Sequence, residues 1–138
     1  MKLIKYQFYL KKCYLFKKNL LDYNMNFKKK YSLEKRKEES AKILNKYPTK
    51  IPIIVEKDAK SKLDNIDKNK YLAPEDLTMA QFLYVIRKRI KLTHEEALYC
   101  FVNNSLPATS TSLAHIYNEH KDEDGFLYVT YCSENTFG

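Results

Sequence analysis

Residues 71–90 read YLAPEDLTMAQFLYVIRKRI and predict a short strand followed directly by a helix. Tyr71-Leu-Ala73 is the strand, and Pro74 ends it because proline has no N–H to donate to a neighbouring strand. Thr78 and Gln81 have the spacing of a capping box, which marks the start of a helix. Apolar side chains then follow at steps of three and four, which predicts one buried helix face: Met79, Phe82, Ile86 and Ile90.

Upstream of this stretch, the β-branched run Ile51–Val55 predicts another strand. Pro52 indicates that it lies near the start of that strand or on a sheet edge. Turn-forming residues at 64–69 separate the two strands. Residues 26–46 show helical spacing, and Pro48 ends that pattern because the residue before a proline avoids the helical region.

Downstream, Thr93 and Glu96 repeat the capping-box spacing and predict a short turn. A buried strand is expected at Leu98–Val102, a short helix at 113–120 and a last strand at Phe126–Tyr131. The order of elements is typical of an α+β fold, the ubiquitin-like β-grasp, with two additional N-terminal helices.

We divide the chain into a domain at residues 25–132, a basic extension at residues 1–24 and a flexible tail at residues 133–138. The formal net charge is +8, and residues 1–30 alone carry nine lysines against one aspartate. Most of the basic charge therefore belongs to the N-terminal segment. We favour a dispensable or non-native extension, with Met25 as a second start. The alternative is an amphipathic helix on a membrane surface.

Cys13, Cys100 and Cys132 have no paired spacing, which indicates a reducing, cytosolic environment. Cys100 lies in an apolar run and is expected in the core.

The three histidines have no ligand spacing with the cysteines, so we predict no metal and no cofactor. The absence of a nucleophile–base pattern argues against an enzyme. The longest apolar runs are about six residues, far short of the roughly 20 that a membrane span needs.

Ten short stretches match one known family in order: Glu34–Arg36, Lys46–Pro48, Ile51–Lys57, Lys70–Leu72, Pro74–Leu77, Gln81–Phe82, Ile86–Ile90, Phe101–Asn104, Tyr117–His120 and Phe126–Tyr128. On these stretches, from about Phe27 to Gly138, the chain resembles the GABARAP-type branch of the autophagy ubiquitin-like modifiers. Its Lys-, Asn- and Tyr-rich composition suggests an AT-rich protist such as an apicomplexan.

The resemblance implies conjugation of Gly138 to phosphatidylethanolamine by an activating and a conjugating enzyme, with a cysteine protease for deconjugation. Glycine suits this chemistry because it has no Cβ to obstruct attack on its carbonyl. Relatives usually extend past this glycine, whereas Gly138 is the last residue here. We expect a modifier that needs no first proteolytic step; the alternative is a sequence given in processed form.

The resemblance also implies binding of aromatic-x-x-aliphatic peptides beside the second strand. The aromatic pocket maps to Glu39, Ile43, Pro52, Lys70, Leu72 and Phe126. The aliphatic pocket maps to Tyr71, Ala73, Pro74, Leu77, Phe82 and Val85. Contacts to acidic residues flanking the motif map to Lys50, Lys68, Lys70 and Arg89. Relatives usually have a larger aliphatic residue at position 73 and often arginine at position 50, so partner preference is expected to differ.

Several alternatives stay open at this point. Without the resemblance, Ile43, Leu77 and Phe82 would be interpreted as core and Arg87–Lys91 as a solvated helix face. A non-conjugated scaffold or cytoskeletal adaptor is the alternative function. Nucleic-acid binding is not expected, because the basic cluster lacks a stacking platform. The expected location is the cytoplasm and the cytosolic face of autophagosome-like or plastid (apicoplast) membranes.

Overall fold

The computed structural model describes residues 26–93 and 95–133. The predictions for the N-terminal extension at 1–24, for Cys13 and for Gly138 lie outside the described residues. So does most of the predicted tail.

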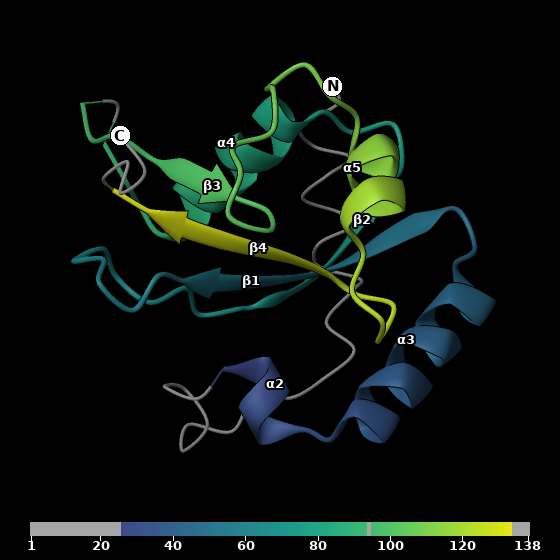
Figure 1. Ribbon diagram of the computed structural model, residues 1–138. Coiled ribbons are helices and arrows are strands. Elements are labelled where there is room, and N and C mark those ends of the chain that lie inside the picture. Colours follow the sequence, from purple (N-terminus) through teal and green to yellow (C-terminus); the bar gives the residue numbers. More distant parts are fainter. Residues whose placement is uncertain (1–25, 94, 134–138) are drawn as a thin grey trace.

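The described residues form a four-stranded mixed sheet in the order β2-β1-β4-β3 (Figure 1). Strand β1 (Lys50–Lys57) pairs antiparallel with β2 (Lys70–Pro74) and parallel with β4 (Leu127–Cys132). The short strand β3 (Tyr99–Phe101) pairs antiparallel with β4. Parallel pairing of β1 with β4 extends β1 to Lys57, beyond the run predicted from the sequence.

Helices α4 (Met79–Arg89) and α5 (Leu113–His120) lie on one side of the sheet (Figure 1). The predicted capping box at the start of α4 is confirmed: the Thr78 hydroxyl accepts from the Gln81 N–H at 3.3 Å, and the Gln81 side chain accepts from the Thr78 N–H at 2.9 Å. The larger apolar cluster, which includes Ile53, Phe82 and Leu127, fills the space between these helices and the sheet.

The other side of the sheet is covered by α2 (Phe27–Lys30) and α3 (Leu33–Lys46) (Figure 1). The two N-terminal helices predicted from the sequence are confirmed, and together they span most of the helical pattern over 26–46. The break occurs because Tyr31 is extended and the Ser32 side chain caps α3 by accepting from the Lys35 N–H. A smaller apolar cluster lies beneath them, made of Phe27, Ile43, Ile54, Leu72 and Phe126.

A buried ionic contact joins α3 to the turn before β4. The Arg36 guanidinium lies 2.6 Å from Asp124 Oδ2, and the Asp124 side chain is fully buried. The Tyr128 hydroxyl donates to the same oxygen at 2.5 Å, and the Phe126 N–H donates to Asp124 Oδ1 at 2.8 Å. Removing one partner of such a pair costs about 3–5 kcal/mol, because it leaves a buried charge unpaired.

The second predicted capping box, at Thr93 and Glu96, is wrong. Glu96 N–H donates to the Thr93 carbonyl at 3.3 Å, so a turn forms. The Thr93 hydroxyl, however, bonds the Glu96 carboxylate at 3.2 Å instead of a backbone N–H. In the described part of this loop no helix follows. The remaining strands and helices confirm the α+β ubiquitin-like fold with N-terminal helices.

Candidate functional site

Strand β2 lies at one end of the strand order, so among the described strands it is an edge. Its register places Leu72 opposite Pro52 and Tyr71 opposite Ile53. Side chains alternate between the two faces of a strand. Accordingly Leu72 belongs to the smaller cluster under α3, whereas Tyr71 and Ala73 belong to the larger cluster under α4. This edge therefore borders both faces of the sheet.

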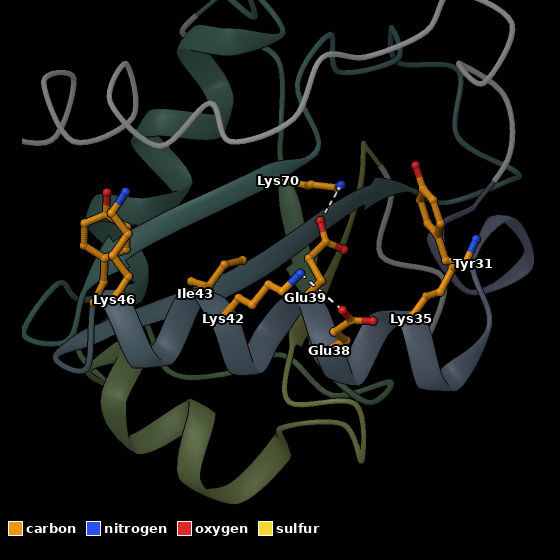
Figure 2. A pocket seen from close by; sticks show the side chains of 9 residues that line it. Tyr31, Lys35, Glu38, Glu39, Lys42, Ile43, Lys46 and Lys70 are labelled. Atoms are coloured by element: carbon orange, nitrogen blue, oxygen red, sulfur yellow. Dashed lines mark hydrogen bonds and ion pairs between the residues drawn. The ribbon is translucent and has the colours of Figure 1, made fainter.

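A pocket of about 470 Å³ lies between α3 and β2 (Figure 2). Its apolar part is formed by Ile43 and two tyrosines, and its rim is charged. Figure 2 shows Tyr31 and Lys46 near opposite ends of α3, with Ile43 and Glu39 between them. The lining residues are Tyr31, Lys35, Glu38, Glu39, Lys42, Ile43, Lys46, Tyr47 and Lys70.

Glu39, Ile43 and Lys70 are the residues of the predicted aromatic pocket that line this space. Leu72 and Phe126 do not line it but are buried in the cluster to which Ile43 belongs. They form the layer beneath the pocket. Pro52 is also buried, opposite Leu72 on the neighbouring strand.

Most residues of the pocket wall were not predicted from the sequence. The wall residues on α3, namely Lys35, Glu38, Lys42 and Lys46, recur at helical spacing, but exposed charges at such spacing are usually interpreted as a solvated face. Tyr31 and Tyr47 immediately follow α2 and α3. Aromatic residues beside a helix that already carries pocket residues are the signal that could have identified them.

An ion pair connects the two sides of the pocket. Lys70 Nζ lies 2.9 Å from Glu39 Oε1, and Figure 2 shows both side chains pointing toward one another. The same ammonium lies 5.0 Å from the centre of the Phe27 ring and 5.4 Å from that of Tyr31. Cations favour the faces of aromatic rings, so α2 takes part in positioning Lys70. The pocket thus offers an apolar base and a charged rim to an aromatic side chain.

The predicted aliphatic-pocket residues come together under α4, where five of the six are buried: Tyr71, Ala73, Leu77, Phe82 and Val85. Pro74 is half-buried at the end of β2. The Tyr71 and Phe82 rings meet edge to face, with centroids 5.8 Å apart. In this structure these side chains are part of the larger core cluster.

The three predicted basic contacts outside the pocket surround β2, and each is half-buried. Lys50 begins β1 and pairs with Pro74 in the register. Lys68 lies two residues before β2. Arg89 is the last residue of α4, and its guanidinium lowers the pKa of the Tyr71 hydroxyl, although burial has the larger effect and raises that pKa.

The structure also gives information on the Cys100 thiol, on metal-binding groups and on membrane-spanning helices. Cys100 is buried, and burial raises the pKa of its thiol, as expected of a core side chain. Within residues 26–93 and 95–133, no group of histidine, cysteine and acidic side chains could hold a metal ion. Nor does this part of the chain contain a helix that is both long and apolar enough to cross a membrane.

Comparison with known proteins gives consistent matches. A family model described as "Autophagy protein Atg8 ubiquitin like" matches residues 35–138. Autophagy-related protein 8c of Arabidopsis thaliana is 56% identical over 115 residues, which cover 83% of this chain and 97% of that protein. Autophagy-related protein 8 of Mycosarcoma maydis is 58% identical over 112 residues, which cover 81% of this chain and 95% of that protein. The crystal structure of Trypanosoma brucei ATG8 matches with a TM-score of 0.76 and 41% identity, covering 83% of this chain and 99% of that one.

Proposed function

Since this chain belongs to the Atg8 family of ubiquitin-like autophagy proteins, we propose that it is conjugated through Gly138 to phosphatidylethanolamine and recruits partners that carry an aromatic-x-x-aliphatic segment. Family membership makes it a non-enzymatic modifier that works with the autophagy conjugation machinery. The specific partners we propose are an activating enzyme, a conjugating enzyme and a deconjugating cysteine protease.

One observation carries the conjugation proposal: the match to the family model continues through the tail to residue 138. The conjugation reaction itself takes place at the C-terminal carboxylate and requires little of the rest of the chain. A terminal carboxylate becomes an acyl donor once ATP adenylates it and releases pyrophosphate. An enzyme thiol then attacks the carbonyl and releases AMP, and the lipid amine finally attacks the resulting thioester and releases the thiol. A glycine at this position allows the backbone to approach closely in narrow enzyme sites.

The edge position of β2 supports the peptide-binding proposal. A partner segment that adds to this edge would satisfy backbone hydrogen bonds, while pockets on the two faces would select its side chains. In an extended segment, an aromatic residue and an aliphatic residue three positions later point to opposite faces. The pocket beside α3 would take the aromatic side chain, and the cluster around Ala73 and Leu77 would rearrange to take the aliphatic one.

Conjugation is tested by changing Gly138. We expect Gly138→Ala to leave the fold unchanged and to abolish the lipid-linked, faster-migrating form when the protein is incubated with its activating enzyme, its conjugating enzyme, ATP and vesicles containing phosphatidylethanolamine. Thr136→Ala, two residues earlier, is the matched control and should be conjugated normally. Attachment of the Gly138→Ala protein through the same bond would overturn the proposal.

The membrane that receives the protein is a separate part of the proposal. We propose autophagosome-like membranes, with the cytosolic face of a plastid as the alternative location. Imaging of tagged protein against markers of both membranes, with and without Gly138, distinguishes them. A protein that binds peptides but is never lipidated in its own cells would instead be a scaffold or cytoskeletal adaptor.

A further inference from the structure

The end of the sheet at which the C-terminal tail begins also carries two loops. Strands β1 and β4 are parallel, so their last residues, Lys57 and Cys132, lie at the same end of the sheet. Strand β3 is antiparallel to β4 and begins at this end, with Tyr99 opposite Cys132. The loop after β1, at 58–69, and the loop before β3, at 90–98, therefore flank the start of the tail (Figure 1).

Tyr131, directly before the last residue of β4, fixes the loop at 58–69 beside the tail. Its carbonyl accepts from the Asp58 N–H at 2.9 Å, and its hydroxyl donates to the Asp64 carbonyl at 2.6 Å. Ile66, later in the same loop, is buried in the larger apolar cluster. The outward-facing side chains of this loop are thus held next to the tail in a defined position.

The two flanking loops differ in charge. Among the described residues, none of the ammonium groups of Lys57, Lys60 and Lys62 has an ion-pair partner, and Lys60 and Lys62 are exposed. Residues 57–69 contain four lysines and three aspartates, a net charge of +1, and three of the four lysines lie within 57–62. Residues 91–98 contain one lysine and two glutamates, a net charge of −1. The tail therefore begins between a basic side and an acidic side.

Conjugation would bring this end of the sheet to a lipid surface, a step that rests on the proposed function. A tail of six residues spans at most roughly 20 Å, so the domain stays close to the lipid. Electrostatic attraction acts over about 8 Å at physiological ionic strength, so the charges beside the tail are the ones that a membrane would affect. Each lysine near an anionic surface strengthens association about fivefold, whereas carboxylates are repelled.

We propose that the loop surface formed by Lys57, Lys60 and Lys62 is a docking surface for anionic phospholipid headgroups. The conjugated protein contacts an anionic membrane through this surface, and the side that carries Glu95 and Glu96 turns away from the lipid. Membrane charge thereby sets the orientation of the protein on the bilayer.

The test measures how close each loop lies to the lipid when the tail is tethered without any conjugating enzyme. The full chain receives a hexahistidine segment after Gly138 and is bound to vesicles that contain a nickel-chelating lipid. The sequence has no tryptophan, so Ala59→Trp and Ala97→Trp each introduce a single reporter at an exposed position, one on each side of the tail. Energy transfer from the tryptophan to a dansyl-labelled lipid is compared between phosphatidylcholine vesicles and vesicles in which part of this lipid is replaced by phosphatidylserine.

We expect phosphatidylserine to raise the ratio of transfer from Ala59→Trp to transfer from Ala97→Trp by about twofold at physiological salt, and high salt to abolish this rise. Adding Lys60→Glu and Lys62→Glu to both reporters should remove the rise. Lys37→Glu with Lys121→Glu reverses two exposed lysines elsewhere on the domain, and this matched control should retain it. Thermal unfolding confirms that each variant folds.

A rise that survives Lys60→Glu with Lys62→Glu, or that is lost equally in the control, would overturn the inference, as would an equal response of the two reporters. If phosphatidylserine has no effect but Lys60→Glu with Lys62→Glu slows conjugation on neutral vesicles, the lysines face an acidic protein partner and the lipid assignment is wrong. Because the tether needs no conjugation, this result is independent of the Gly138→Ala test, in which a failure of the proposed function would be seen.

Discussion

Gly125, in the turn before β4, has a backbone φ of 91°, and a Cβ at this position would lie 2.5 Å from the Ser40 Oγ of α3. The turn also carries Asp124, whose carbonyl accepts a hydrogen bond from the Ser40 hydroxyl. Helix α3 therefore approaches the turn so closely that only a residue without a side chain fits. The positive φ adds a second penalty for any other residue.

We expect Gly125→Ala to lower the free energy of unfolding by about 2 kcal/mol, from the unfavourable φ together with the displacement of Ser40. Urea unfolding monitored by circular dichroism measures the change. A double-mutant cycle with Ser40→Ala separates the cost of the unfavourable φ from the cost of displacing Ser40. Loss of the Ser40 hydroxyl should lower the free energy of unfolding by less when alanine already occupies position 125. An unchanged unfolding midpoint in Gly125→Ala would show that the turn can relax away from α3.

At the scale of elements, α2 is attached to the domain by polar and aromatic contacts. Lys28 Nζ lies 2.6 Å from Asp122 Oδ1, and the Phe27 N–H donates to Glu56 Oε2 at 2.8 Å. Burial alone would raise the pKa of Asp122. The hydrogen bonds from Lys28 and from the Asp124 N–H outweigh burial and hold that pKa below its usual value. The ionised Asp122 carboxylate is thus one of several contacts that hold this four-residue helix.

The sign of the resulting pH dependence follows from linkage. A carboxylate whose pKa is lowered in the folded state contributes stability above the unfolded pKa of about 4. That contribution is lost as the pH falls through the folded value. We expect Lys28→Met to cost at most about 1 kcal/mol at neutral pH, because the lysine is partly exposed. It should also weaken the decline in melting temperature below about pH 4.

Thermal unfolding of wild type and Lys28→Met across this acidic range provides the measurement. Lys29→Met changes the next exposed lysine of the same helix and is the control for lost charge alone. If both variants change the pH profile equally, the effect comes from net charge and the contact with Asp122 is not its cause.

The elements also show what the sequence could predict. The capping box at Thr78 and the apolar steps that follow it were sufficient for α4, because the signals are local. Two N-terminal helices were expected, but the position of the break between them was not, because it is set by the extended Tyr31 and by the Ser32 cap at the start of α3. The length of β1 depends on pairing with β4, some 70 residues away in the chain, so no local pattern could set it.

The site was predictable to the extent that family resemblance specified it. Glu39, Ile43 and Lys70 were assigned to the pocket from the sequence and do line it. The α3 lysines that line the pocket were not assigned to it from the sequence. A charged residue on a helix surface becomes part of a pocket wall only when another element faces it, and the helical pattern alone does not show this.

At the scale of the whole molecule, residues 26–93 and 95–133 already contain two apolar clusters, the ionic contact at Asp124 and the pocket beside α3. Each of these is built from partners within the described residues. Residues 1–24 carry six lysines and one aspartate, so they contribute five of the eight net positive charges. Residues 1–24 thus carry most of the net positive charge of the chain.

A chain that starts at Met25 should therefore keep its stability and its peptide affinity. We expect the unfolding free energy to change by no more than about 0.5 kcal/mol, the usual range for changes remote from a core, and the affinity for an aromatic-x-x-aliphatic peptide to stay within about twofold. Chemical denaturation and calorimetry on the full chain and the shortened chain provide the comparison. A marked drop in stability would mean that residues 1–24 are part of the domain. If stability is unchanged but unconjugated full-length protein alone binds anionic vesicles, in a salt-dependent way, the extension is a membrane-surface segment and is not dispensable.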